Sequence, residues 1–163
     1  MSECLENFLS SGKFLINLSR LPGVDFYCQS ISTPDITVNT TNVNYIAGHT
    51  FETDTQISYG NLTINFIVDE NLNNYNQVLN WLKGISPDTS LEESKKLYDE
   101  SKQIGSGFDY TDIELIFPKS KQTYVYKNCV PTSLSGLEFN VSEDLFISAS
   151  VTFMVPQIEI SKK

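Results

Sequence analysis

Residues 59–82 read YGNLTINFIVDENLNNYNQVLNWL, and the spacing of their apolar side chains changes halfway along. In the first half apolar and polar residues alternate, which predicts a β-strand over 59–68 with one buried face and one polar face. The predicted core positions on this strand are Leu62, Ile64, Phe66 and Val68.

The second half predicts an amphipathic helix over residues 70–82 that packs on the sheet. Its apolar residues recur at the three- and four-residue spacing of one helix face. This stripe consists of Leu72, Tyr75, Leu79 and Leu82. Asp69 is the predicted N-cap and Gly84 the predicted C-terminal stop, and we place Leu79 and Trp81 in the core.

Alternation with a period of two recurs on both sides of this stretch. Residues 14–19 and 26–30 flank a Leu-Pro-Gly turn and predict a first hairpin, and residues 112–117 and 123–130 flank a Pro-Lys-Ser turn and predict a second. Residues 145–155 carry the longest alternation and predict one long strand, with Val151 and Phe153 in the core. The predicted fold is mainly β, an antiparallel barrel or sandwich with one or two helices.

Length, charge and cysteine content limit the possible classes of protein. We expect a single domain over residues 1–163, a length that can bury one core. The net charge of -9 disfavours nucleic-acid binding. We find no membrane-spanning run and no signal peptide, so we expect synthesis in a cytoplasm and no membrane partner. Three scattered cysteines, Cys4, Cys28 and Cys129, fit reduced thiols.

Two segments do not fit the regular pattern. Residues 37–56 are polar and rich in Thr and Asn, and we interpret them as an extended arm that finds its partners on other subunits. Its predicted assembly residues are Val43, Tyr45, Ile46, His49 and Phe51. Residues 84–108 form an insertion of unassigned role, with a weaker helix predicted over 91–103.

Candidate catalytic and ligand-binding residues are few, and each has a simpler reading. His49 is the single histidine, so a Cys-His nucleophile pair would have to use it from within the polar arm. Asp112 and Glu114 lie two apart on one face of a strand, where a solvated face is the commoner reading than acid-base chemistry. Residues 69–80 lack the Gly and the closing Glu of a calcium loop. We therefore predict no enzyme activity, no metal and no cofactor.

The sequence resembles a known family in three places. Val68, Asp69 and Glu70 join a strand to a helix that closes with Trp81, and this junction resembles the tail tube proteins of contractile-tailed phages. The Leu-Pro-Gly turn at 21–23 with the residues after it resembles the first hairpin of that family. The strand through Phe153 resembles its last strand. Together these matches cover roughly residues 14–82 and 145–160.

The resemblance implies a structural protein of the virion tail, assembled in the host cytoplasm. It implies a barrel whose copies form six-membered rings, with strands joining around the lumen and the arm meeting neighbouring copies. The rings stack into a tube that contacts sheath and baseplate proteins and passes DNA without binding it specifically. Asp112 and Glu114 are the expected lumen-facing acidic residues.

Other readings remain open at this point. Within the same fold, the chain could cap, initiate or terminate the tube. A glycan-binding β-sandwich would present exposed rings, and Tyr124 and Tyr126 are the candidates for stacking on sugars. A small cytosolic hydrolase that uses Asp112 and Glu114, or a cysteine, has only residue type in its favour.

Overall fold

The computed structural model describes residues 14–18, 20–21, 24, 27–45, 48–86, 92, 110–118, 121–140 and 146–162, and of 41–55 only the backbone. The strands are β1 (Leu15–Leu18), β2 (Cys28–Ser32), β3 (Ile36–Tyr45), β4 (Gly48–Tyr59), β5 (Asn61–Ile67), β6 (Thr111–Phe117), β7 (Gln122–Leu134), β8 (Ser148–Met154) and β9 (Gln157–Lys162). One helix, α2 (Asn73–Ile85), follows β5. In these residues no helix is long and apolar enough to cross a bilayer.

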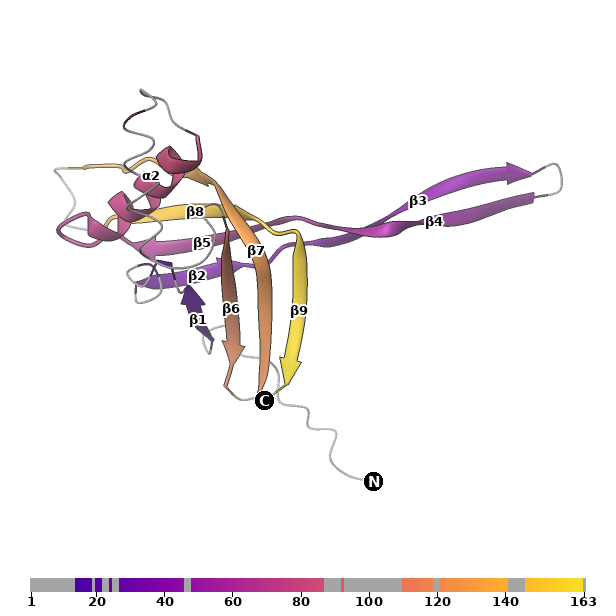
Figure 1. Ribbon diagram of the computed structural model, residues 1–163, viewed down its shortest axis with the longest axis horizontal. Coiled ribbons are helices and arrows are strands. Elements are labelled where there is room, and N and C mark those ends of the chain that lie inside the picture. Colours follow the sequence, from indigo (N-terminus) through magenta and orange to yellow (C-terminus); the bar gives the residue numbers. More distant parts are fainter. Residues whose placement is uncertain are drawn as a thin grey trace.

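The strands form a two-layered sandwich whose layers share β7 (Figure 1). The first half of β7 pairs with β6 and β9, and β1 pairs with β6, which gives a four-stranded sheet in the order β1-β6-β7-β9. The second half of β7 pairs with β8, which continues through β5 to β2. All of these pairs are antiparallel, and no ladder among the described strands joins β1 to β2. The structure is therefore an open sandwich and not a closed barrel.

The predicted first hairpin is wrong, and the predicted second hairpin is confirmed. β1 and β2 do not pair with each other: Ile16 lies opposite Leu115 of β6, and Ile31 lies opposite Ile64 of β5. Strands β1 and β2 therefore belong to different layers. Strands β6 and β7 pair directly across their short connection, as expected.

The central β5-β8 ladder forms the middle of the core. Leu62 lies opposite Phe153 and Ile64 opposite Val151, and all four side chains are fully buried. Phe66 is also fully buried, while Val68 lies just beyond β5 and packs half-buried against the core. The alternate residues point outward, where the Thr63 and Thr152 hydroxyls lie 3.5 Å apart. One face of each strand is core and the other is polar, because successive side chains alternate between faces.

The C-terminal alternation makes two strands instead of one. β8 ends at Met154, and after Pro156 the chain continues as β9 in the other layer, where Ile158 lies opposite Tyr126. A proline cannot donate a backbone hydrogen bond to a ladder, so Pro156 is a natural break between two strands. Leu145 lies outside the described residues.

Helix α2 begins three residues later than predicted and without the predicted cap. Leu72 occupies the N-cap position with a left-handed φ of 58°, and no side chain caps the helix. The Asp69 backbone carbonyl instead accepts a turn hydrogen bond from the Leu72 N–H at 2.8 Å. Gly84 is not a stop, since it is buried inside the last turn, and the helix ends at Ile85.

The buried stripe of α2 also differs from the predicted one. Its buried residues are Asn74, Val78, Trp81 and Gly84. Leu72 is 37% exposed and Leu79 is only half-buried, so the predicted stripe and the core assignment of Leu79 were partly wrong. Trp81 is buried as expected: its ring lies 6.0 Å from that of Phe153, and the Arg20 guanidinium lies 4.6 Å from its centroid.

Asn74 takes the anchoring role that the sequence had suggested for Asp69. Its side-chain Oδ1 accepts hydrogen bonds from the backbone N–H groups of Asp69 and Tyr75, and its Nδ2 donates to the Ile67 carbonyl at 2.8 Å. The side chain is 2% exposed. A single buried amide therefore ties the end of β5 to the first turn of α2.

We expect Asn74→Ala to lower the free energy of unfolding by about 2–3 kcal/mol, because it leaves buried backbone groups without partners. Asp69→Ala should change it by less than about 0.5 kcal/mol, since that side chain only accepts an exposed 3.4 Å hydrogen bond from Asn73. Urea denaturation of both variants measures the difference. A larger loss for Asp69→Ala than for Asn74→Ala would restore Asp69 as the cap.

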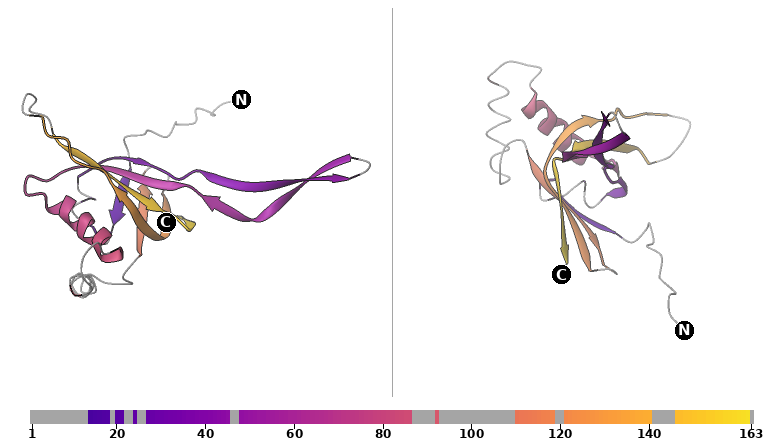
Figure 2. Two further views of the ribbon diagram at one scale, coloured as in Figure 1. Left: turned by 90° about the horizontal axis from the view of Figure 1, so that it is seen from above. Right: turned by 90° about the vertical axis from the view of Figure 1, so that its right-hand side faces the viewer.

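Residues 37–56 lie in β3 and β4, which pair with each other in a two-stranded sheet. The prediction that this arm lacks partners within its own chain is therefore wrong, because its backbone groups bond across the hairpin. The hairpin extends far from the sandwich in Figure 1 and in the left view of Figure 2. Of the 84–108 insertion, only 84–86 and Glu92 lie among the described residues, and the helix predicted over 91–103 otherwise lies outside them.

Candidate assembly surfaces

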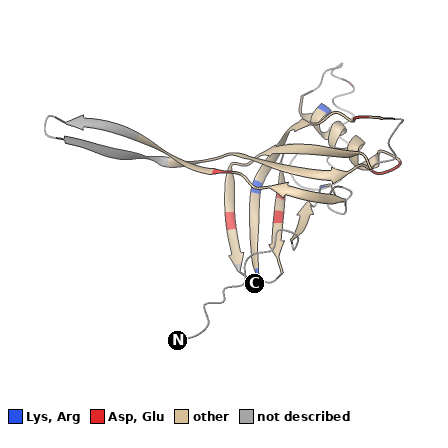
Figure 3. Ribbon diagram, turned by 180° about the vertical axis from the view of Figure 1, so that it is seen from behind, with Lys and Arg blue, Asp and Glu red and all other residues tan. Residues whose placement is uncertain are grey.

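The outward face of the β1-β6-β7-β9 sheet carries a band of polar and charged side chains. The strand registers place Asn17, Glu114, Val125 and Glu159 in one row across all four strands. The Asn17 Nδ2 donates to a Glu114 carboxylate oxygen at 3.1 Å, and the Gln157 Nε2 donates to Glu159 at 3.2 Å. Acidic residues on β6 and β9 flank a basic one on β7 (Figure 3).

Strand β9, and with it Glu159 on this face, was not predicted from the sequence. The signal was present, since Ile158 and Ile160 alternate with Gln157 and Glu159 after the proline. The predicted lumen residues Asp112 and Glu114 both lie on this face, and both carboxylates are engaged by neighbouring strands.

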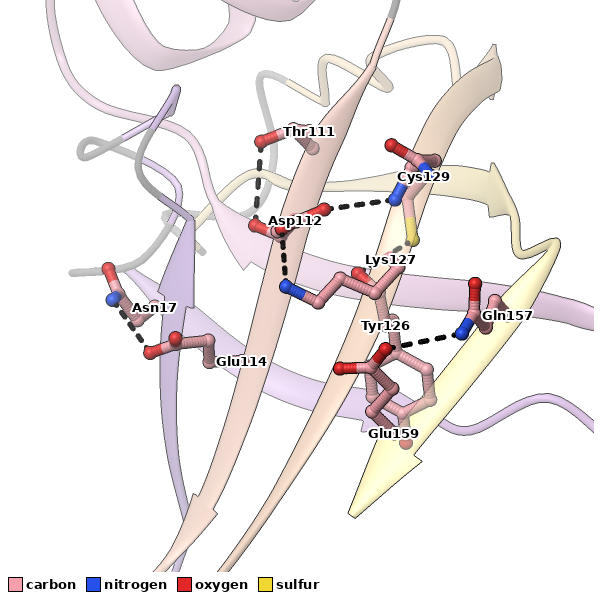
Figure 4. Close-up of polar contacts among 10 residues, drawn as sticks. Asn17, Thr111, Asp112, Glu114, Tyr126, Lys127, Cys129, Gln157 and Glu159 are labelled. Carbon is pink, nitrogen blue, oxygen red and sulfur yellow. Dashed lines mark hydrogen bonds and ion pairs between the residues drawn. The ribbon is translucent and has the colours of Figure 1, made fainter. Parts of the chain in front are cut away.

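Asp112 sits at an irregularity in the β6-β7 ladder and bonds twice to β7 (Figure 4). One carboxylate oxygen lies 3.0 Å from the Lys127 Nζ, and the other accepts the Asn128 backbone N–H at 2.9 Å. Asn128 has a left-handed φ of 53°, a conformation that Asn tolerates better than most residues. Asp112 thus stabilises the irregularity in the β6-β7 ladder and forms an ion pair with Lys127.

These contacts shift the pKa values of both partners. Partial burial alone would raise the pKa of Asp112, but the Asn128 N–H and the Lys127 ammonium outweigh it and hold that pKa below its ordinary value. The Asp112 carboxylate raises the pKa of Lys127 above its ordinary value. Both groups are therefore ionised at neutral pH.

We expect Asp112→Asn to lower the free energy of unfolding at pH 7 by about 0.2–1 kcal/mol, since the pair is partly exposed and screened by solvent. Because the folded pKa of Asp112 is depressed, its contribution is present above the unfolded value and is lost as pH falls through the folded one. The difference from wild type should therefore shrink as the pH falls below the ordinary Asp pKa of 3.8.

Glu114→Gln is the matched control on the same face, because it keeps an acceptor for Asn17. We expect it to change the free energy of unfolding by less than about 0.5 kcal/mol. The measurement is urea denaturation of both variants at pH 7 and in acid, below the ordinary Asp pKa. A loss for Asp112→Asn that persists unchanged in acid would mean that the amide disturbs the Asn128 contact and that the ion pair contributes nothing.

The residues considered for catalysis are not brought together. Cys129 is fully buried and donates to the Tyr126 carbonyl at 3.4 Å. Burial, with a smaller contribution from the Asp112 charge, raises the pKa of Cys129 to about 12, so its thiol is not ionised near neutrality. His49 lies near the far end of the arm, opposite Asn44 in the hairpin. Among the described residues no group of three or more His, Cys, Asp or Glu side chains could hold a metal ion.

The tyrosines considered for sugar stacking belong to the interior. Tyr126 is 2% exposed, and burial is the main cause that raises its pKa to about 12. Tyr124 is half-buried and makes an edge-to-face contact with Phe117, with ring centroids 5.7 Å apart. Tyr126 therefore cannot present its ring to a glycan.

The arm residues lie on the outer part of the hairpin. Val43 pairs with Thr50, Tyr45 with Gly48 and Asn42 with Phe51, while Ile46 lies outside the described residues. At the root of the arm, the Gly60 N–H donates to the Asp35 carbonyl at 2.8 Å. A Cβ at Gly60 would lie 3.2 Å from the Asp35 backbone nitrogen, so this close approach favours glycine.

The comparisons with solved structures agree with this fold. The chain is similar to the tube-terminating cap of the anti-feeding prophage, with a TM-score of 0.65 and 15% identity over 100% of this chain and 97% of that one. It is similar to a chain of the PVC sheath-tube complex, an extracellular contractile injection system, with a TM-score of 0.63 and 16% identity over 98% and 95%. It is also similar to the PVC sheath/tube terminator, with a TM-score of 0.61 and 16% identity over 97% and 99%.

Sequence comparison identifies the family. No curated protein matches the sequence significantly. The profile of the family described as phage tail tube protein, however, matches residues 5–157, which is nearly the whole chain. The chain therefore belongs to the phage tail tube protein family.

Proposed function

We propose that this protein is a non-enzymatic subunit of the inner tube of a contractile phage tail, where copies join edge to edge in rings that stack into a conduit for DNA. The observation that carries the proposal is the four-stranded sheet β1-β6-β7-β9, which has one apolar face, one polar face and two edges that no other described strand pairs with. Family membership supports the same assignment.

The two edges of this sheet suit each other. Among the described strands, β1 pairs only with β6 and β9 only with β7, so each presents a second edge. Four antiparallel strands alternate in direction, so β1 and β9 run in opposite senses. Copies related by rotation can then continue one antiparallel sheet, and a closed ring leaves no free edge. Six copies per ring is part of the proposal and comes from the family resemblance.

The charge on the outward face of the sheet is the reason to assign that face to the bore. The inward face packs into the core through Ile113, Leu115 and Tyr126. The outward face carries Asp112, Glu114 and Glu159 against Lys127. In a ring this face would present net negative charge to the lumen, and repulsion of phosphates favours sliding of DNA over specific binding.

The arm and the outer surface are assigned to contacts with other subunits. A two-stranded hairpin far from any core is only marginally stable alone, which supports contacts with neighbouring copies in the ring and along the stack. Similar solved chains come from a sheath-tube complex and from a baseplate, which supports sheath and baseplate proteins as partners in the virion tail.

Electron microscopy of the purified protein tests the proposal. We expect rings or open-bored tubes. A dispersed monomer at high concentration would contradict it and favour a separate binding module.

A terminator or cap of the same tube is the second candidate, because two of the similar structures have those roles. Copy number per particle separates the two. Many stacked rings per tail indicate the tube subunit, and one ring per tail indicates the terminator.

A further inference from the structure

An apolar groove of about 500 Å³ lies between the root of the arm and the inward face of β6, β7 and β9. Ile36 and Tyr59 line it from the arm, and Phe117, Tyr124 and Ile160 line it from the sheet. None of its described lining residues is charged. At its rim Ile36 is 62% exposed and Ile160 is 60% exposed. A contiguous apolar hollow marks a surface that something covers.

One end of the groove lies where the chain enters β1. Leu15 lies opposite Ile116, so the chain before it passes beside Phe117 at the end of β6. The ends of β6, β7 and β9 on this side extend past the layer of β2, β5 and β8 (Figure 1). Phe14 packs half-buried against the core. Residues 1–13, which lie outside the described residues, therefore join the sandwich at the rim of the groove.

The sequence of residues 1–13, MSECLENFLSSGK, matches the chemistry of the groove. Three large apolar residues recur at the three- and four-residue spacing that gathers side chains on one side of a helix. They are Leu5, Phe8 and Leu9. The opposite side of the same helix would carry only polar residues, Glu3, Asn7 and Ser10. The remaining residues, Ser-Ser-Gly-Lys at 10–13, have the composition of a linker.

This linker is long enough to bring the apolar residues to the groove. Three strand spacings separate β1 from β9, roughly 14 Å. The chain between Phe14 and Leu9 can span about 17 Å when extended. The groove follows β7 from Gln122 to Tyr126, about 13 Å, and two turns of helix cover about 11 Å.

We propose that the groove is the seat of the N-terminal segment of the same chain, residues 1–9, with Leu5, Phe8 and Leu9 against its apolar lining. The short linker keeps the segment at a high effective concentration beside its own groove, which favours it over the same segment of another copy. The seated segment covers Ile36 and Ile160 in the single subunit. This inference does not depend on the proposed function, because it concerns one copy.

Disulfide trapping in the full-length subunit, dispersed at low concentration, tests the seat. In a background with Cys4→Ser and Cys28→Ser, Leu9→Cys is combined with Ile160→Cys. The matched control combines Asn7→Cys with Ile160→Cys, since Asn7 lies on the polar side of the segment and is tethered by a linker of nearly the same length. Without a seat, two tethers of similar length should crosslink alike, so we expect the Leu9 pair to form the intrachain disulfide roughly fivefold more.

Mass spectrometry and non-reducing electrophoresis distinguish the outcomes. Equal yields of the intrachain disulfide from the two pairs would mean that the segment is not seated, and would overturn the inference. A disulfide-linked dimer from the Leu9 pair, in place of the linked monomer, would assign the groove to the segment of a second copy and would also overturn it. Neither result bears on whether the protein forms rings or tubes.

A charge on the segment gives a second measurement that leaves the sandwich unchanged. Phe8→Asp places a carboxylate against an uncharged groove, which should release the segment because burial of an unpaired charge is costly. We expect the fluorescence of a dye that binds apolar surface, such as ANS, to rise by about twofold or more. Asn7→Asp is the control and should leave the signal at the wild-type value. Equal signals from both variants would contradict the seat.

Discussion

We expect removal of the outer arm to leave a subunit that folds but does not assemble. The change deletes residues 42–54 and joins the two strands by a short Gly/Ser turn. It keeps the root of the hairpin, where Ile36 pairs with Tyr59 and Val38 with Ile57. Among the described strands, the deleted part pairs only within the hairpin. The ladders of the sandwich therefore stay intact, while the element assigned to neighbouring copies is lost.

Circular dichroism, thermal unfolding and electron microscopy together measure this result. We expect an unchanged β signature and cooperative unfolding, with no rings or tubes. A control keeps the hairpin length and changes Val43, Tyr45 and Phe51 to Thr, and it should assemble less well than wild type while folding normally. Normal tubes from the deletion variant would make the arm dispensable, and failure to fold would assign it to the core.

The largest losses of stability should come from two phenylalanines of the central ladder. Phe66→Ala and Phe153→Ala should each lower the free energy of unfolding by about 3–5 kcal/mol, because each removes a large buried side chain and leaves a cavity. Both residues are 0% exposed, and Phe153 also contacts the ring of Trp81. Chemical denaturation of the unassembled subunit is the measurement, so that assembly does not add to the stability.

Phe139→Ala is the matched control, since the same side chain is 71% exposed there. We expect it to change the free energy of unfolding by less than about 0.5 kcal/mol. Losses below about 1 kcal/mol at both Phe66 and Phe153 would mean that the buried and exposed faces of β5 and β8 are reversed.

The apolar face and the charged face of the β1-β6-β7-β9 sheet lie on opposite sides, and together they separate the two kinds of contact that the protein is proposed to make. The proposed contacts between copies use backbone edges, which depend little on salt. The proposed contact with passing DNA is repulsive and depends on ionic strength. Salt should therefore affect the passage of DNA more than the joining of subunits.

The sequence by itself determined the faces of the strands and the presence of the helix. Leu62, Ile64 and Phe66 are buried as the alternation predicted, because the face of a side chain on a strand depends only on its position along that strand. The β6-β7 hairpin was predictable because only residues 118–121 separate its strands, whereas residues 19–27 separate β1 from β2, which do not pair with each other.

Only the tertiary structure decided which distant strands pair and where the polar anchors lie. Alternation does not specify which strands pair, because every residue except proline offers the same backbone donor and acceptor. The pairing of β1 with β6 and of β2 with β5 is therefore known only from the structure. Asn74, and not Asp69, anchors the helix, because its Nδ2 donates a hydrogen bond to the Ile67 carbonyl on the preceding strand. Asp112 lies beside Lys127 because the β6-β7 ladder shifts register there, which the alternation of the two strands does not predict. The apolar groove of about 500 Å³ lies between the root of the arm and β6, β7 and β9, and it depends on segments distant in sequence that folding brings together.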